Sequence, residues 1–227
     1  MLLVTVTVLF YLISFVDMSD SPQAGVFICF EGIDGSGKTS HSRFVVDHLK
    51  SVGYDAVYTT EPTRYSVPGR TLRESFFAPQ RLPVEEEFRL FLEDRIIHLK
   101  DEVIPQLKNG KIVVTDRYYF SSVAYQGSRG LDWRYILEEN EKVSLVPDIV
   151  LLLDLPVDVA ISRIANDRVE GVNTFEKKES LQTVKEIYFA LVEKFPNLFQ
   201  VVDVNKPLPD VKVIINNLVL EFLKNRA

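Results

Sequence analysis

The residues best suited to chemistry form a glycine-rich stretch, GIDGSGKT, at positions 32–39. The stretch fits the pattern G-x-x-x-x-G-K-[ST] at every defined position. Segments of this type direct backbone N–H groups at the phosphates of a nucleotide. We therefore expect Lys38 to reach the β- and γ-phosphates and the Thr39 hydroxyl to ligate Mg²⁺. The residues expected to bind a nucleoside triphosphate are Gly32, Ile33, Asp34, Gly35, Ser36, Gly37, Lys38 and Thr39.

A second reactive pair, Asp116-Arg117, directly follows the apolar run at 112–114. In parallel sheets, ligands bind at the carboxyl ends of the strands, so this pair should face the glycine-rich loop across a crevice. Asp116 could hold Mg²⁺ through water, and Arg117 could clamp a phosphate. The two segments together predict a nucleotide site with the means to handle a transferred phosphoryl group.

Strands alternating with helices must position these groups. Apolar runs predict strands at 26–30, 54–60, 111–116, 149–154 and 199–204. Helical patterns or stretches occupy 38–52, 85–108, 121–126, 132–143, 157–167, 181–195 and 210–224, with a short helix after Pro68-Gly69. This alternation predicts an α/β fold with a doubly wound parallel sheet of about five strands and helices on both faces. Pro105 should end or kink its helix one turn early.

Composition narrows the function classes. The 227 residues include 32 acidic and 26 basic ones, for a net charge of −6, which argues against a broad nucleic-acid surface. A single cysteine, Cys29, cannot form an internal disulfide, which is typical of a reducing compartment and favours the cytoplasm. The three histidines lack the i,i+4 spacing of a helical metal site, so we expect no structural metal.

Residues 1–24 form an N-terminal extension ahead of a single predicted domain at 25–227, which contains no internal repeat or long linker. The first 16 residues of the extension are uncharged but fall short of the roughly 20 apolar residues that a membrane span needs. The extension could be a membrane anchor, an extra strand or a misplaced start. We favour the last, with Met18 as the true start, and do not expect membrane attachment.

Five segments, taken in order, are similar to one enzyme family. They are FEGIDGSGKT (30–39), TEP (60–62), FLEDR (91–95), DRYYFSSVAYQG (116–127) and PDIVLLLD (147–154). This set, spanning about residues 26–204, resembles the thymidylate kinases, which transfer the γ-phosphate of ATP to dTMP in dTTP synthesis. The resemblance implies a P-loop NTPase-like fold with a small mobile lid over ATP, dependence on Mg²⁺ and, commonly, a homodimer.

The resemblance also assigns an acceptor site. It implies that Phe91 stacks on thymine and that Arg95, on the same helix face, hydrogen-bonds the base edge. It places Ser122 against the base ring and Tyr125 against the 2′ carbon of the sugar, where a ribose hydroxyl would not fit. Asp34 accepts from the 3′-OH. The implied dTMP-binding set is Asp34, Pro62, Arg73, Phe91, Arg95, Arg117, Ser122 and Tyr125, with Arg64 competing with Arg73 for the acceptor phosphate.

Some members of the family carry an arginine within the phosphate loop, but residues 33–36 here include no cation. The resemblance therefore assigns the missing charge to a lid at 167–171, with Arg168 approaching the transferred phosphate. It assigns Arg163 to packing on adenine. The implied catalytic set is Lys38, Asp116, Arg117 and Arg168, and the implied metal ligands are Thr39 and Asp116.

Two other functions remain open from the sequence. A deoxyribonucleoside kinase would act on a 5′-hydroxyl and need a carboxylate base, for which Glu61 stands in roughly the right region. A regulatory nucleotide switch would bind without transfer, and would have no use for Phe91, Arg95, Tyr125 or a lid arginine.

Overall fold

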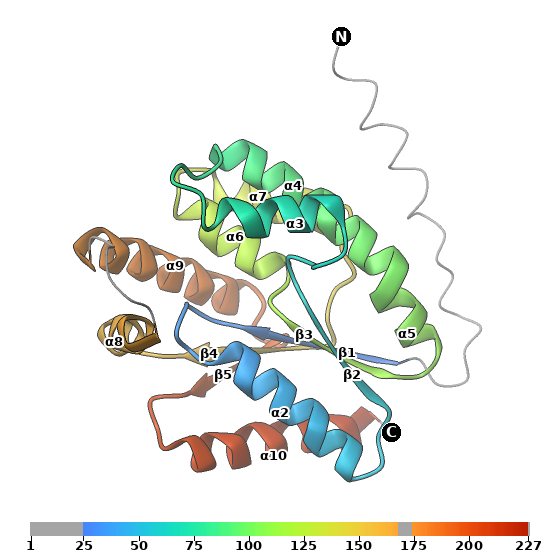
Figure 1. The fold of residues 1–227 in the computed structure, drawn as a ribbon. Helices are drawn as coiled ribbons and strands as arrows, with labels where there is room; N and C mark the ends of the chain where they lie inside the picture. The colour runs from blue at the N-terminus through green and yellow to red at the C-terminus, as the bar shows by residue number, and fades with distance from the viewer. Residues whose placement is uncertain (1–24, 168–173, 227) are drawn as a thin grey trace.

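The computed structural model describes residues 25–167 and 174–226 (Figure 1). Its centre is a five-stranded sheet in which every pairing is parallel and the strand order is β2-β3-β1-β4-β5. The strands are β1 (Val26–Glu31), β2 (Ala56–Thr60), β3 (Ile112–Asp116), β4 (Ile149–Asp154) and β5 (Phe199–Asp203). β1, β3 and β4 are almost entirely buried, as continuous apolar runs predict for strands covered on both faces.

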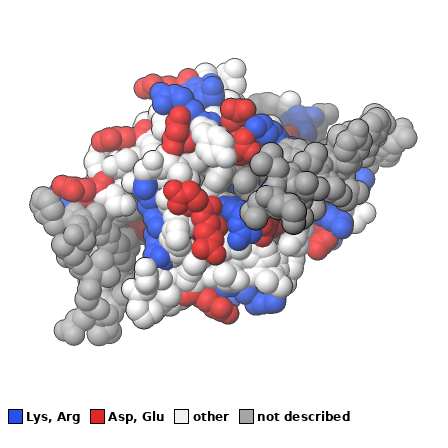
Figure 2. Space-filling model, turned by 90° about the horizontal axis from the view of Figure 1, so that it is seen from above, with Lys and Arg blue, Asp and Glu red and all other residues white. Residues whose placement is uncertain are grey.

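Helices cover both faces of the sheet. In Figure 1, α2 (Lys38–Ser51) and α10 (Leu208–Arg226) lie together below it, and most of the others lie above. The others are α3 (Val67–Ser75), α4 (Val84–His98), α5 (Ile104–Lys108), α6 (Tyr119–Gly127), α7 (Trp133–Glu141), α8 (Val157–Asp167) and α9 (Thr174–Lys194). Seen from above in Figure 2, acidic and basic side chains are intermixed on this surface. The α/β doubly wound parallel fold predicted from the sequence is confirmed.

Strand register brings the reactive segments to one edge of the sheet. Phe30 of β1 and Thr60 of β2 both pair with Asp116 of β3. The loop that follows β1, the turn that follows β3 and the segment that follows β2 therefore leave the sheet side by side. This edge is where the site must form.

The helix predicted at 85–108 is the main departure from the expected elements. α4 ends at His98, a π-helical segment, η2 (Leu99–Val103), follows, and α5 resumes with Pro105 in its first turn. A proline has no N–H to donate and its ring clashes with the carbonyl four residues earlier, so an α-helical turn cannot precede it undisturbed. The wider π turn takes up this misfit, and α-helical hydrogen bonding does stop before Pro105.

Two predicted features lie outside the described residues: the extension at 1–24 and Arg168 with most of the lid. Within the described ranges, none of the helices has the length and apolar character needed to cross a membrane.

Candidate active site

The loop after β1 needs its glycines. Gly32, Gly35 and Gly37 have φ values of 143°, 83° and 86°, which side-chain-bearing residues rarely adopt. A Cβ on Gly35 would also lie 2.8 Å from the carbonyl oxygen of Ala160 in α8, so the loop packs closely against that helix. The tight backbone leaves N–H groups and the start of α2 facing one cavity.

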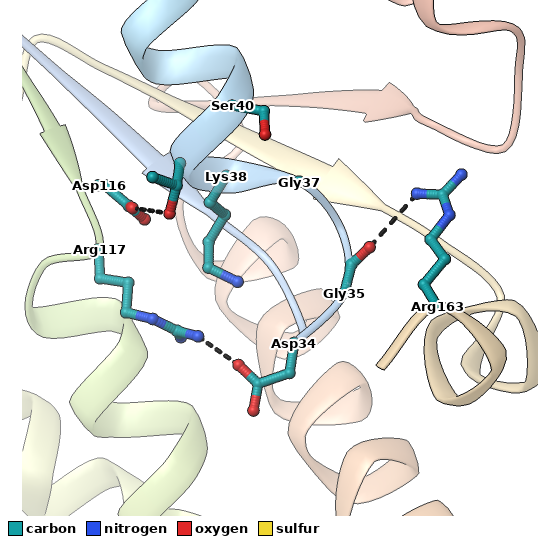
Figure 3. A pocket seen from close by; sticks show the side chains of 9 residues that line it. Asp34, Gly35, Gly37, Lys38, Ser40, Asp116, Arg117 and Arg163 are labelled. Carbon is teal, nitrogen blue, oxygen red and sulfur yellow. Dashed lines mark hydrogen bonds and ion pairs between the residues drawn. The ribbon is translucent and has the colours of Figure 1, made fainter. Parts of the chain in front are cut away.

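The side chain of Lys38 folds back against this loop and does not extend into solvent. Its Nζ donates to the carbonyl oxygens of Gly32 and Ile33, each at 2.9 Å. Burial, followed by the positive charge of Arg117, lowers the pKa of Lys38 to about 8. Figure 3 shows the ammonium group extending beneath the loop toward Asp34 and Arg117, where an incoming phosphate could replace the carbonyls.

Asp116 and Thr39 form a pair that fits a cation. The Thr39 hydroxyl donates to Asp116 Oδ2, which Tyr58 Oη also approaches at 3.3 Å. Asp116 Oδ1 is buried and has no hydrogen-bond partner among residues 25–167 and 174–226. The same ranges contain no cluster of three or more His, Cys, Asp or Glu side chains able to hold a metal. This donor set suits Mg²⁺, which typically binds one or two protein ligands together with substrate phosphates.

Arg117 is held in a sparsely populated backbone conformation, with φ at 69°. Its N–H donates to the Phe30 carbonyl at 3.0 Å, and its carbonyl accepts from the Thr115 hydroxyl at 2.7 Å. The guanidinium pairs with Asp34 (Figure 3). It also lies 5.0 Å from the centre of the Tyr125 ring. Strained residues that the surroundings hold on both sides often mark functional sites, and this one carries the predicted phosphate clamp.

Glu31, the last residue of β1, supports the turn that presents Arg117. Its buried carboxylate accepts from the backbone N–H groups of Tyr118 and Ser121 at 2.9 and 3.1 Å, and from Tyr188 Oη at 2.8 Å. Burial raises the pKa of Glu31 although these donors act to lower it. Glu31 was not predicted to act here, although an acidic side chain at the end of a buried strand was a usable signal.

Two cavities, each of about 530 Å³, meet at the carboxyl edge of the sheet. One lies along the glycine-rich loop and reaches Arg163. The other extends from the end of β2 to α3, α4 and α6. The walls of both cavities include Asp34, Thr39, Asp116 and Arg117. A group bound in one cavity would therefore face a group bound in the other across these four side chains.

Most predicted acceptor residues line the second cavity: Asp34, Pro62, Arg73, Phe91, Arg117 and Tyr125. Arg73 Nε donates to the carbonyl oxygens of Pro62 and Thr63 at 2.9 and 3.2 Å. Arg64 lines the cavity too, so the structure leaves both arginines beside the acceptor site. Of the two, Arg73 has the fixed position.

Arg95 and Ser122 do not line this cavity, which departs from the expected base contacts. Arg95 is fully buried, with Nε and Nη2 donating to Glu61 Oε2 at 3.0 and 2.6 Å and Nη1 donating to Asn140. Its guanidinium is therefore engaged by Asn140 and by Glu61, which itself lines the cavity. Ser122 is also buried, and its Oγ has no partner within the described ranges.

Phe76 and Gln126 line the cavity and were not predicted to act there. The Phe76 ring stacks near Phe91, with centroids 6.5 Å apart. Gln126 Nε2 donates to Glu87 at 2.7 Å, whereas its Oε1 is buried without a partner in the described part of the chain. Gln126 was visible in the motif DRYYFSSVAYQG, but its amide orientation depends on a residue 39 positions away.

On the donor side, Arg163 lies at the rim of the first cavity. Its Nη1 donates to the Gly35 carbonyl at 3.3 Å (Figure 3). Its Nη2 donates to the Val204 carbonyl at 3.2 Å. The guanidinium is thus held at the open end of the loop.

Comparison with known proteins agrees with this arrangement. The family model described as thymidylate kinase matches residues 30–215. A probable thymidylate kinase of Archaeoglobus fulgidus is 39% identical over 87% of this chain and 96% of its own length. Thymidylate kinases of Brachyspira hyodysenteriae and Akkermansia muciniphila are 40% and 44% identical, over 75% and 73% of this chain and 83% and 79% of their own lengths. The chain therefore belongs to the thymidylate kinase family.

Proposed function

We propose that the protein transfers the γ-phosphate of ATP to dTMP, giving dTDP, with Mg²⁺ as the metal ion. The observation that carries this proposal is the meeting of two nucleotide-sized cavities at Asp34, Thr39, Asp116 and Arg117. ATP occupies the cavity along the glycine-rich loop, and dTMP the cavity lined by Phe91 and Tyr125. The reacting phosphates then lie at the shared wall.

Charge stabilisation and positioning supply most of the catalysis in this type of reaction. Lys38 exchanges its loop carbonyls for the β- and γ-phosphates, and Arg117 bridges the transferred group and the acceptor phosphate. Bound Mg²⁺ would be held by Thr39 and Asp116 and would neutralise charge on the donor phosphates. Asp34 orients Arg117 through their ion pair and is placed to accept from the sugar 3′-OH.

No general base is required, because the acceptor is already an anionic phosphate oxygen. This point separates the proposal from the deoxyribonucleoside kinase alternative. Glu61, the base that the alternative would need, lines the second cavity, but it is 2% exposed and binds Arg95 with one oxygen and His98 with the other. Burial acts to raise its pKa, but Arg95 and His98 outweigh that effect and lower it. A buried carboxylate with both oxygens engaged is poorly placed to take a proton from a substrate.

The second cavity suits a flat, uncharged base. Phe91 and Phe76 offer apolar ring faces, and Gln126 Oε1, which has no partner in the described ranges, can accept from the N3–H of thymine. In this arrangement Arg95 acts as a positioning residue, because it binds Glu61, which lines the cavity. Ser122 is not among the residues that line the cavity, and its contact with the base ring stays a prediction.

The remaining parts of the proposal rest on the resemblance. Arg163 packs on adenine, and Arg168, in the lid, stabilises the transferred phosphate. We also propose that residues 25–227 form a single domain, that the protein forms a homodimer and that it is located in the cytoplasm. A non-catalytic switch fits less well, because it would not need a second nucleotide-sized cavity facing the first.

Measuring ADP release tests the proposed function. The full-length protein is supplied with ATP and Mg²⁺ and with dTMP, dUMP, UMP or thymidine as the acceptor. Turnover is expected to be highest with dTMP and absent with thymidine. Turnover with thymidine alone would support the nucleoside kinase, and ATP binding without turnover on any acceptor would support the switch.

Discrimination against ribonucleotides is expected to depend on the Tyr125 ring. Tyr125→Leu should raise kcat/KM for UMP relative to dUMP by about tenfold, because these acceptors differ only in the 2′-hydroxyl that the ring excludes. Steady-state kinetics with both acceptors measures the ratio. Tyr125→Phe, which keeps the ring, serves as the matched control and should retain the wild-type ratio. Equal ratios in all three proteins would remove Tyr125 from sugar selection.

A further inference from the structure

A buried carboxylate on α4, Glu87, collects four hydrogen bonds beside the acceptor cavity. Arg81 donates to it through Nε and Nη2 at 2.7 and 2.9 Å, and Arg129 through Nη1 at 2.7 Å. Gln126 Nε2 supplies the fourth bond at 2.7 Å. An ionised carboxylate offers about four acceptor positions and no donor, so every position on Glu87 is occupied by an N–H group.

This arrangement determines which way the Gln126 amide points. Because Glu87 can only accept, the NH₂ end of the amide must face it, and the carbonyl end must face away. Gln126 lines the acceptor cavity, and its Oε1 is shielded from water without a partner among the described residues. Buried acceptors are nearly always satisfied in proteins, so a ligand N–H is the natural partner for this oxygen.

We propose that Glu87 is a positioning residue that sets base selectivity, because it makes the cavity offer an acceptor instead of a donor. The inference rests on the proposed function and adds the origin of one part of its specificity. Thymine and uracil carry an N–H at N3, whereas cytosine has an acceptor at that position. The orientation of Gln126 thus favours thymine and uracil. With cytosine, the lone pair on N3 would face the lone pairs of Gln126 Oε1, which is unfavourable.

The two arginines make the effect of neutralising Glu87 predictable. Oε2 receives Arg81 Nε and Arg129 Nη1, while Oε1 receives Arg81 Nη2 and Gln126 Nε2. In Glu87→Gln, the amide oxygen is expected at the Oε2 position, because both donors there belong to guanidinium groups that cannot accept, whereas at Oε1 one of the two donors, Gln126, can turn round. The new NH₂ group then faces Gln126, which must turn its own oxygen inward and present NH₂ to the cavity. The preferred base edge is thereby reversed.

Binding of dUMP and dCMP, measured by isothermal titration calorimetry, tests this inference, since the two nucleotides differ only at that edge of the base. The wild-type protein is expected to bind dUMP more tightly by about 10²-fold or more. Glu87→Gln should reduce the Kd ratio at least about tenfold. Glu86→Gln makes the same chemical change at an exposed neighbour on α4 and should keep the wild-type ratio. Parallel weakening of both nucleotides in Glu87→Gln would overturn the proposal, because a purely structural role predicts that result.

A second variant guards against loss of folding in the first. The exchange Glu87→Gln with Gln126→Glu restores the negative charge of the cluster, and the carboxylate at 126 can only accept. Preference for dUMP should therefore be retained, and its loss would contradict the proposal even if Glu87→Gln cannot be purified. The ratio of the Kd values for dUMP and dCMP can be measured whether or not the protein phosphorylates either nucleotide. Failure of the wild-type protein to phosphorylate dTMP or dUMP would instead count against the proposed function.

Discussion

Replacement of Arg117 by glycine is expected to lower kcat for dTMP phosphorylation by about 10³-fold, the lower end of what an arginine at a transferred phosphoryl group contributes. The guanidinium lies at the wall shared by both cavities, so its loss removes positive charge where the transition state carries negative charge. Glycine is the cleanest replacement because the position has φ at 69°, which glycine adopts without strain. Steady-state kinetics, together with thermal unfolding, measures both effects.

Two further variants separate the effect of the backbone conformation on stability from the effect of the side chain on kcat. Arg117→Ala should lose as much kcat as Arg117→Gly but also unfold at a lower temperature, because alanine is strained at positive φ. Arg117→Lys keeps the charge without the planar fork and should recover only part of the rate. If Arg117→Gly retained kcat within tenfold of wild type, the guanidinium would not be the phosphate clamp.

Replacement of Arg95 by methionine is expected to destabilise the fold by about 3–5 kcal/mol, the usual result of leaving a buried charge without its partner. Arg95 is 0% and Glu61 2% exposed, so neither can turn to water when the other is removed. Urea unfolding followed by circular dichroism measures the difference. If Arg95 instead acted mainly on the base, the variant would unfold like wild type and show only a raised KM for dTMP.

A double replacement, Arg95→Met with Glu61→Gln, serves as the control. Removing both charges also removes the uncompensated carboxylate, so much of the lost stability should return. Stability that stayed as low as in Arg95→Met would mean that the damage comes from lost packing rather than from the unpaired Glu61.

Local features of the fold could be predicted because their signals are contiguous. Apolar runs located each strand to within about two residues, and the glycine-rich motif located the phosphate loop in full. α9 was predicted from 181 but begins at Thr174. The predicted segment is the part whose apolar side chains pack into the core. The earlier part is largely polar and lacks that periodicity.

The acceptor site was predictable only in part, because its geometry depends on partners distant in sequence. Arg95 binds Glu61, 34 positions earlier, so its guanidinium is engaged by another protein side chain and Arg95 is not among the residues that line the cavity. Gln126 depends in the same way on Glu87. Charged residues on a helix look alike in sequence whether they face solvent, substrate or each other, and only tertiary packing distinguishes them.

The close packing of Gly35 on α8 limits how the sequence of this loop can change. Any side chain at this position would meet the backbone of Ala160, and the residue's φ of 83° already disfavours one. A larger residue at Gly35 would therefore require α8 to move outward and the loop backbone to change. We expect substitutions at Gly35 and at the α8 residues beside it to be tolerated together rather than one at a time.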